Sequence, residues 1–258
     1  MENSNKPTKD IFRFKQFSVV QGDVAMRVNT DGVLLGAFMA NYILQQSICP
    51  SKILDIGSGT GVISLMLAQA LSKKRNNFYE IDAIDIEQEC FEISKLNFEN
   101  SLWNRCLHSH HTSLQNFGTD KNSYDIIVSN PPFFHNSIKS KNMETAVAKH
   151  TISLTFDDLI SKSCGLLKDS GSFCVIIPGD RMDDFLSLAQ KFFLYPKEIV
   201  NIYSKETDII ENMGVKRVII LLSKGIQELS TSSHFLYTDN RATRSEWYRN
   251  LTKEYYLD

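Results

Sequence analysis

Short apolar runs alternate with longer amphipathic segments along most of the chain. The apolar runs have the length and composition of buried strands, and they cover residues 52–56, 80–86, 105–110, 124–129 and 172–177. Between them, apolar residues recur at helical spacing over residues 62–71, 88–97 and 156–167. This alternation predicts an α/β fold in which helices cover both faces of a mostly parallel sheet.

The two ends of the chain carry different patterns. Residues 11–30 alternate apolar and polar positions around a turn at Gln21–Asp23, with residues 25–28 after it, which predicts a short β-hairpin. Residues 32–46 follow with helical spacing. Toward the other end, a helical segment over 183–193 precedes two apolar runs with no clear long helix between them, at 198–203 and 217–223. The simplest arrangement for these two strands is an antiparallel pair.

Length and charge limit the choice of architecture and partner. The 258 residues, 42% of them hydrophobic, predict a single domain over 1–258, with a hairpin and helix extension at 1–46 and a core at 47–258. A net charge of −2 means that any nucleic-acid contact must come from a local basic patch. Residues 1–6 lack the apolar core of a signal peptide, and the longest apolar stretch, around 32–44, is too short to span a bilayer. We therefore expect a soluble cytoplasmic protein with no membrane partner.

A glycine loop follows the first apolar run and opens a helix, in the sequence Asp55-Ile56-Gly57-Ser58-Gly59-Thr60-Gly61. A triphosphate site would need Lys and then Ser or Thr after the last glycine, but Val62 follows it. A dinucleotide site would place its third glycine at position 62. The carboxylate of Asp55 would repel a pyrophosphate, whereas it suits a ligand that carries an ammonium group. S-adenosylmethionine has such a group and no phosphate.

A second acid stands at the end of the next apolar run, in Ala83-Ile84-Asp85-Ile86. An acid at this position can accept hydrogen bonds from ribose hydroxyls, although an exposed loop acid is the alternative for Asp85 alone. With the D-x-G-x-G-x-G pattern, this half of the chain resembles the Rossmann-like methyltransferases of class I. The resemblance implies a seven-stranded, mostly parallel sheet with an antiparallel last strand. It also implies that S-adenosylmethionine is bound by Asp55, Gly57, Gly59, Gly61 and Asp85.

The run at 124–129 leads directly into Asn130-Pro131-Pro132-Phe133. If the strands run 3-2-1-4-5, this turn and the glycine loop leave adjacent strands at the switch in strand order, where ligands bind. An exocyclic adenine amine is a poor nucleophile because its lone pair is delocalised. The Asn130 oxygen and the Pro131 carbonyl can accept its two hydrogens, and Phe133 can stack on the base. We therefore predict Asn130, Pro131 and Phe133 as catalytic residues, with Asn130 also beside the cofactor.

A plain turn is the alternative for an isolated Asn-Pro-Pro-Phe, since Asn-Pro starts turns and Pro-Pro stiffens them. The tetrapeptide is similar to the signature of amino-group methyltransferases, which act on adenine N6, on guanine N2 or on a glutamine side chain. It therefore indicates a nitrogen acceptor and leaves the substrate open at this point.

Four further segments narrow the substrate: Phe14–Phe17, Ala25–Gly36, Ala148–His150 and Tyr237–Leu257. Together they resemble the bacterial tRNA1(Val) (adenine(37)-N6)-methyltransferase family, which modifies the adenine just 3′ of the valine anticodon. The resemblance implies that Thr30 and Asp31 lie over the cofactor, although a capped helix start also accounts for Asp31. Ser113 stands where relatives often carry an acid that meets the cofactor adenine.

Basic residues near these motifs are candidates for RNA contact, and a solvated surface is the alternative for each cluster. They are Lys139, Lys141, Lys149, Arg241 and Arg244. No metal site is expected, because no Cys or carboxylate spacing completes one around His108, His110 and His111. No obligate protein partner is expected either.

Three functions remain in competition. The first is N6 methylation of an adenine in tRNA, with adenine 37 of tRNA1(Val) as the acceptor. The second is methylation of guanine N2 in rRNA or of a glutamine side chain in a protein. The third is a non-catalytic scaffold that binds S-adenosylmethionine and partners another subunit.

Overall fold

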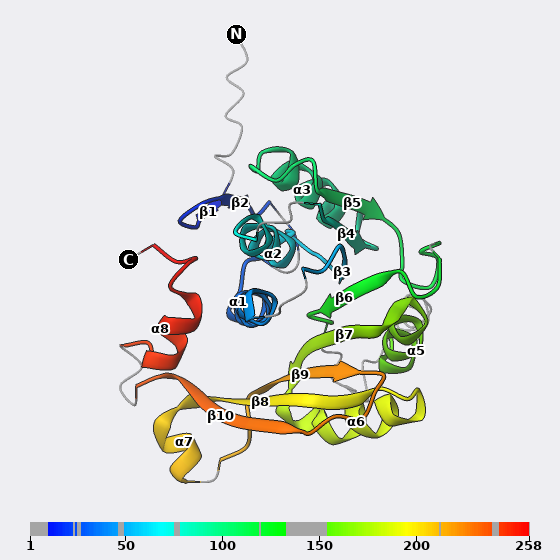
Figure 1. Ribbon diagram of the computed structural model, residues 1–258. Helices are drawn as coiled ribbons and strands as arrows, with labels where there is room; N and C mark the ends of the chain where they lie inside the picture. The colour runs from blue at the N-terminus through cyan, green and yellow to red at the C-terminus, as the bar shows by residue number, and fades with distance from the viewer. Residues whose placement is uncertain are drawn as a thin grey trace, which may run out of the picture. The chain divides into compact units, whose positions relative to one another are not determined.

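The computed structural model describes residues 10–257, except for 23, 25–26, 46–48, 75–77, 119, 133–153, 212 and 239–242. The chain divides into two compact units, the first made of residues 1–112 and 249–258 and the second of residues 113–248. Figure 1 shows the helices and strands of both units.

The first unit begins with a hairpin of β1 (Ile11–Arg13) and β2 (Ser18–Val20), which pair antiparallel with Phe12 opposite Val19. The hairpin is confirmed, and Gly22 does lie in a turn with positive φ, but this is not, as predicted, the turn that joins the two strands. The joining turn lies between the two strands, where the Phe14 N–H donates to the Phe17 carbonyl at 2.9 Å. The rings of Phe14 and Phe17 stack at 4.6 Å between centroids, so burial of two aromatic rings selects this turn.

Three parallel strands form the sheet of the first unit, in the order β3-β4-β5. They are β3 (Lys52–Ile56), β4 (Glu80–Asp85) and β5 (Leu107–His111). The helices of this unit are α1 (Thr30–Gln45), α2 (Val62–Ser72) and α3 (Gln88–Glu99). Helices α1 and α2 pack against each other, and α3 packs on β5 and β4 (Figure 1). Every strand and helix predicted between residues 32 and 110 is present with small shifts of its ends.

Five strands form the sheet of the second unit, in the order β10-β8-β9-β7-β6. They are β6 (Tyr124–Ser129), β7 (Leu167–Pro178), β8 (Tyr195–Lys205), β9 (Arg217–Ser223) and β10 (Ser230–Tyr237). Strand β6 is parallel to β7, and β10 is parallel to β8. Strand β9 is antiparallel to both of its neighbours, which confirms the predicted antiparallel pair.

The helices of the second unit and the chain's last helix complete the described elements. They are α5 (Phe156–Leu166), the 3-10 helix η1 (Gly179–Arg181), α6 (Met182–Lys191), α7 (Glu206–Ile210) and α8 (Glu246–Thr252). Thr155 begins α5 by accepting a hydrogen bond from the Asp158 N–H through its hydroxyl. No helix in the described part of the chain has both the length and the apolar composition that a bilayer crossing requires.

The α/β class is confirmed, but the predicted strand number of seven is wrong, since the described residues alone form eight main-sheet strands. The additional strand is β10, whose sequence Ser-Thr-Ser-Ser-His-Phe-Leu-Tyr begins with four hydroxyl side chains. It lies at the edge of its sheet, mostly accessible to water, and therefore lacks the apolar run that marked the other strands.

Candidate functional site

The glycine loop connects β3 to α2 through three glycines with positive φ. Gly61 is the residue before α2, and a Cβ there would lie 2.5 Å from Cε1 of Phe98, so only glycine fits. A Cβ on Gly57 would meet no atom within 4 Å, so that side of the loop faces open space. The loop is therefore closely packed on α3 at one end and accessible to a ligand at the other.

Most backbone donors of this loop are already used by the protein itself. The N–H groups of Gly57 and Ser58 donate to the Ile84 carbonyl at 2.9 and 3.1 Å. The Gly59 N–H donates to Oδ2 of Asp85 at 2.8 Å, and the Gly61 N–H donates to the Ser58 carbonyl at 2.8 Å. A phosphate-binding loop presents such groups to its ligand. This loop instead favours a ligand without phosphate, as the sequence predicted.

Asp55 is the buried acid of the loop. Its Oδ2 accepts a hydrogen bond from the Ser64 hydroxyl at 2.7 Å, whereas Oδ1 is buried and has no partner among the described residues. Burial raises the pKa of Asp55 to about 7, and the Ser64 hydrogen bonds partly oppose that rise. A buried acceptor without a donor is costly, so Asp55 fits a ligand that brings an N–H or O–H group.

Asp85 ends β4 and has both of its carboxylate oxygens partnered. Oδ2 accepts from the Gly59 N–H, and Oδ1 accepts from the Glu87 N–H at 2.9 Å. Burial raises the pKa of Asp85, while these backbone hydrogen bonds oppose the rise. Because each carboxylate oxygen has a second lone pair, Asp85 can still accept from a ligand hydroxyl.

Thr30 and Asp31 form the first turn of α1, and both are half-buried. The residue that caps this helix is Asn29, whose side-chain oxygen accepts from the Gly32 N–H at 2.9 Å. The helix start is therefore capped, as in the alternative explanation, and Asp31 is the acid of its first turn, where a negative charge favours the helix dipole. The expected contact of Thr30 and Asp31 with a cofactor stays a prediction.

The second unit supplies Asn130, which directly follows β6. The residue is 7% exposed, and its side-chain oxygen has no partner among the described residues. Pro131 is also buried, whereas Pro132 is exposed. Asn130 therefore carries a second buried acceptor that is available to a donor. Phe133 lies outside the described residues.

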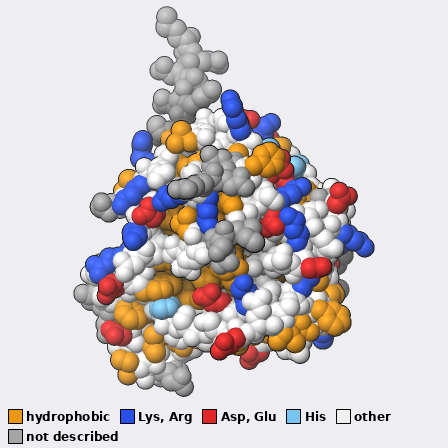
Figure 2. All heavy atoms as spheres, in the orientation of Figure 1, with side chains coloured by type: hydrophobic (Ala, Val, Ile, Leu, Met, Phe, Trp, Pro, Cys, Tyr) orange, Lys and Arg blue, Asp and Glu red, His pale blue; other side chains and the backbone are white. Residues whose placement is uncertain are grey.

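The other predicted residues of the second unit divide into described and undescribed ones. Ser113 is half-buried, and its hydroxyl accepts from the Asn116 N–H at 3.3 Å, so it stabilises a local turn. Arg244 is exposed, with its guanidinium 5.6 Å from the centre of the Tyr248 ring. On the face shown in Figure 2, basic side chains are interspersed with acidic ones. The remaining candidates for RNA contact lie outside the described residues: Lys139, Lys141, Lys149 and Arg241.

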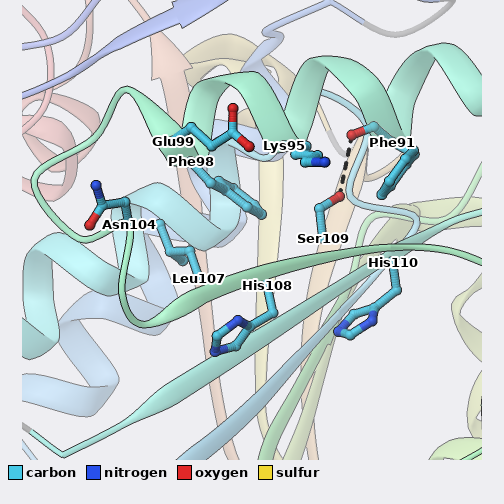
Figure 3. A pocket seen from close by; sticks show the side chains of 9 residues that line it. All are labelled: Phe91, Lys95, Phe98, Glu99, Asn104, Leu107, His108, Ser109 and His110. Carbon is cyan, nitrogen blue, oxygen red and sulfur yellow. Dashed lines mark hydrogen bonds between the residues drawn. The ribbon is translucent and has the colours of Figure 1, made fainter.

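His108 and His110 of β5 line a hollow of about 390 Å³ beside α3 (Figure 3). His108 and His110 project from the same side of the strand, as predicted for alternate strand positions, and Ser109 projects toward α3 (Figure 3). His110 pairs through Nε2 with Oδ1 of Asp82 at 2.8 Å. Among the described residues, no group of three or more His, Cys, Asp or Glu side chains could hold a metal ion.

Sequence reasoning missed Ser64, the residue that holds Asp55. Helix α2 is apolar except for a few small or amide side chains, and Ser64 is fully buried among them. A polar residue inside an apolar helix, nine positions after an acid that is expected to bind a ligand, was the signal available in the sequence.

Comparison with known proteins agrees with this geometry. Residues 34–192 match the family described as Methyltransferase small domain. A relative from Flavobacterium psychrophilum, named tRNA1(Val) (adenine(37)-N6)-methyltransferase, is 38% identical over 249 residues, which cover 96% of this chain and 99% of the relative. A relative of the same name from Christiangramia forsetii is 35% identical over 258 residues, covering 98% of this chain and 99% of the relative. The chain belongs to the tRNA1(Val) (adenine(37)-N6)-methyltransferase family.

Membership of this methyltransferase family confirms the resemblance found in the sequence. A solved structure described as a predicted O-methyltransferase from Agrobacterium tumefaciens has a TM-score of 0.64 at 13% identity, covering 87% of this chain and 96% of that one. At that identity the likeness is one of fold alone, and it supports the methyltransferase architecture. The family model spans both the glycine loop and Asn130, which lie in different units.

Proposed function

We propose that this protein transfers a methyl group from S-adenosylmethionine to N6 of an adenine in tRNA, with adenine 37 of tRNA1(Val) as the acceptor. The observation that carries the proposal is the buried Oδ1 of Asp55, which has no partner among the described residues, in a loop whose own N–H groups are mostly used. That combination suits a cationic, phosphate-free cofactor. The choice of adenine 37 as the acceptor is based on the name of the relatives.

The residues of the first unit would hold the cofactor by distinct contacts. Oδ1 of Asp55 would accept from the ammonium group, directly or through a water, and so gain the partner that it lacks. Asp85 would accept from ribose hydroxyls through the lone pairs that its backbone donors leave over. The open side of Gly57 leaves room for the cofactor backbone. Gly59, Gly61, Thr30 and Asp31 complete the proposed cofactor contacts of the first unit, and Ser113 stays a candidate for contact with the cofactor adenine.

Asn130 and Pro131 would orient the acceptor amine. S-adenosylmethionine, when bound, supplies an electrophilic methyl group on a sulfonium. The Asn130 side-chain oxygen and the Pro131 carbonyl accept the two amine hydrogens, which favours a pyramidal nitrogen with an available lone pair. That pair forms the new N–C bond as the S–C bond breaks, and the amine then loses its extra proton to solvent. Phe133 would stack on the base, and positioning would contribute most of the rate enhancement.

The basic candidates would contact the tRNA backbone around the anticodon loop. They are Lys139, Lys141, Lys149, Arg241 and Arg244. Phosphate contacts of this kind make binding weaken as the salt concentration rises. We also propose that the protein acts in the cytoplasm, as a single-domain enzyme that needs no second protein.

The test is methyl transfer by the purified protein alone. We expect labelled methyl from S-adenosylmethionine to enter an unmodified tRNA1(Val) transcript as N6-methyladenine, and a transcript with guanine at position 37 to remain unlabelled. Label on guanine N2 of rRNA, or on a glutamine side chain, would contradict the proposal and favour the second of the three competing functions. Transfer to none of these acceptors, with cofactor still bound, would indicate a scaffold.

A further inference from the structure

Asn97 of α3 is a buried asparagine that joins two segments far apart in the sequence. Its side-chain oxygen accepts from the Val20 N–H at 2.8 Å, and its Nδ2 donates to the Val20 carbonyl at 3.0 Å. The same Nδ2 donates to the Thr60 carbonyl at 2.9 Å. Val20 is the last residue of β2, and Thr60 lies between the second and third glycines of the loop. One amide group therefore ties the hairpin to the glycine loop.

The chemistry of these three bonds requires an amide. Val20 presents both an N–H and a carbonyl, and Thr60 presents a carbonyl, so the group between them must accept once and donate twice. Asparagine does both, whereas an aspartate of the same shape has no N–H to donate. Asn97 is 2% exposed, so water does not replace a lost bond at low cost.

The neighbours of Asn97 on α3 make the same connection by packing. A Cβ on Gly22, just after the hairpin, would lie 2.8 Å from Cδ1 of Ile93. A Cβ on Gly61 would lie 2.5 Å from Phe98, whose ring projects from α3 toward β5 (Figure 3). One face of α3 thus contacts both the hairpin end and the end of the glycine loop. A shift of either segment must move α3 or break these contacts.

We propose that Asn97 is a positioning residue that couples the N-terminal hairpin to the glycine loop, so that the hairpin helps to set the affinity for S-adenosylmethionine. The inference rests on the proposed cofactor site and extends it to a segment that need not touch the cofactor. Coupling between two segments is reciprocal, so cofactor binding must also stabilise the hairpin.

The experiment measures S-adenosylhomocysteine binding by calorimetry in the wild type, in Asn97→Asp and in the matched control Asn100→Asp. Asn100 is on the same helix end but is exposed, and its Nδ2 donates to the Leu96 carbonyl of its own helix. We expect Asn97→Asp to weaken binding about tenfold, within the range of typical coupling energies, and Asn100→Asp to leave it unchanged. Equal affinity in wild type and Asn97→Asp would overturn the coupling.

Hydrogen exchange distinguishes coupling from a purely structural role of Asn97, because only coupling makes exchange in the hairpin depend on the cofactor. In the wild type, S-adenosylhomocysteine should slow exchange of peptides covering residues 18–22, and in Asn97→Asp this cofactor-dependent change should vanish. If Asn97→Asp does not fold, hydrogen exchange in the wild type is sufficient to test the coupling. Cofactor-dependent protection of the glycine loop without any change at residues 18–22 would overturn it. Failure of the wild type to bind S-adenosylhomocysteine would instead overturn the proposed function.

Discussion

The strand ends at β3 and β6 each carry a buried oxygen acceptor that has no partner among the described residues, but the two acceptors differ in kind. Asp55 can carry a charge, and Ser64 holds its second oxygen. Asn130 is a neutral amide that cannot take up a proton near neutral pH. The first is suited to hold a cation. The second can orient an amine without removing its proton. Under the proposed function, this difference would give binding to the strand end at β3 and chemistry to the strand end at β6.

Replacing Asn130 should have the largest effect. In Asn130→Ala the amine loses an oriented acceptor, so we expect kcat to fall by about 10²–10³-fold, the range for losing one preorganised polar group. The affinity for S-adenosylhomocysteine should change little. Single-turnover kinetics and calorimetry separate the two quantities. Asn104→Ala, at an exposed position, is the control. A comparable loss of cofactor affinity in Asn130→Ala would show that the residue is misassigned.

Asp55→Asn should have the next largest effect, and it should change the affinity for the cofactor more than kcat. The change keeps the shape but removes the charge-assisted hydrogen bond to the ammonium group, which contributes about 1.5–3 kcal/mol. We therefore expect the Kd for S-adenosylmethionine to rise by about 10–100-fold, while kcat at saturating cofactor is affected less. If saturating cofactor restores none of the activity, the division between binding and chemistry is wrong.

The charge on Asp55 also predicts how binding depends on pH. Burial raises its pKa to about 7, and the ammonium group binds the ionised form. Well above pH 7 the carboxylate is already ionised, so its contribution to affinity should be at its maximum there. Below pH 7 a proton must leave before the ligand binds, so affinity should fall up to tenfold per pH unit. Calorimetry across pH 5.5–8.5 measures this, and a flat profile in the wild type would contradict it. Asp55→Asn should lack the dependence.

The sequence predicted elements best where burial alone decides them. The limits of β3, β6 and β9 are those of their apolar runs, because strands buried on both faces need continuous apolar side chains. The hairpin turn was misplaced because Gln21–Asp23 has turn-forming residues, whereas packing of the Phe14 and Phe17 rings selects an earlier turn. Strand β10 was missed because its polar residues are stabilised by pairing with β8.

In the candidate site, too, some residues could be predicted from the sequence and others could not. Spacing alone made Asp55 a candidate, because an acid two residues before a glycine loop constrains the ligand chemistry. Its partner Ser64 and the bridge through Asn97 depend on side chains meeting across elements, which no local pattern reports. Local motifs therefore indicate the groups that meet a ligand, and tertiary packing supplies the residues that hold them.

Ser64→Ala should have the smallest effect of these substitutions. It tests most directly whether the strand end at β3, unlike the one at β6, acts through a charge. The Ser64 hydroxyl donates to Oδ2 of Asp55, and one such bond contributes about 0.5–1.5 kcal/mol. Its loss should raise the pKa of Asp55 further, because this bond favours the ionised form. We expect affinity for S-adenosylhomocysteine to fall a few-fold near pH 7, and the midpoint of its pH profile to move upward.

The matched control for Ser64→Ala is Ser72→Ala on the same helix, where the hydroxyl donates to the Gln69 carbonyl instead. It should leave the midpoint unchanged. If Ser64→Ala weakens binding equally at every pH, Ser64 acts on loop geometry and the ionisation of Asp55 does not govern cofactor affinity. An upward shift of the midpoint, with affinity recovered at high pH, would establish that the strand end at β3 binds through its charge. No titration of this kind is open to the amide of Asn130.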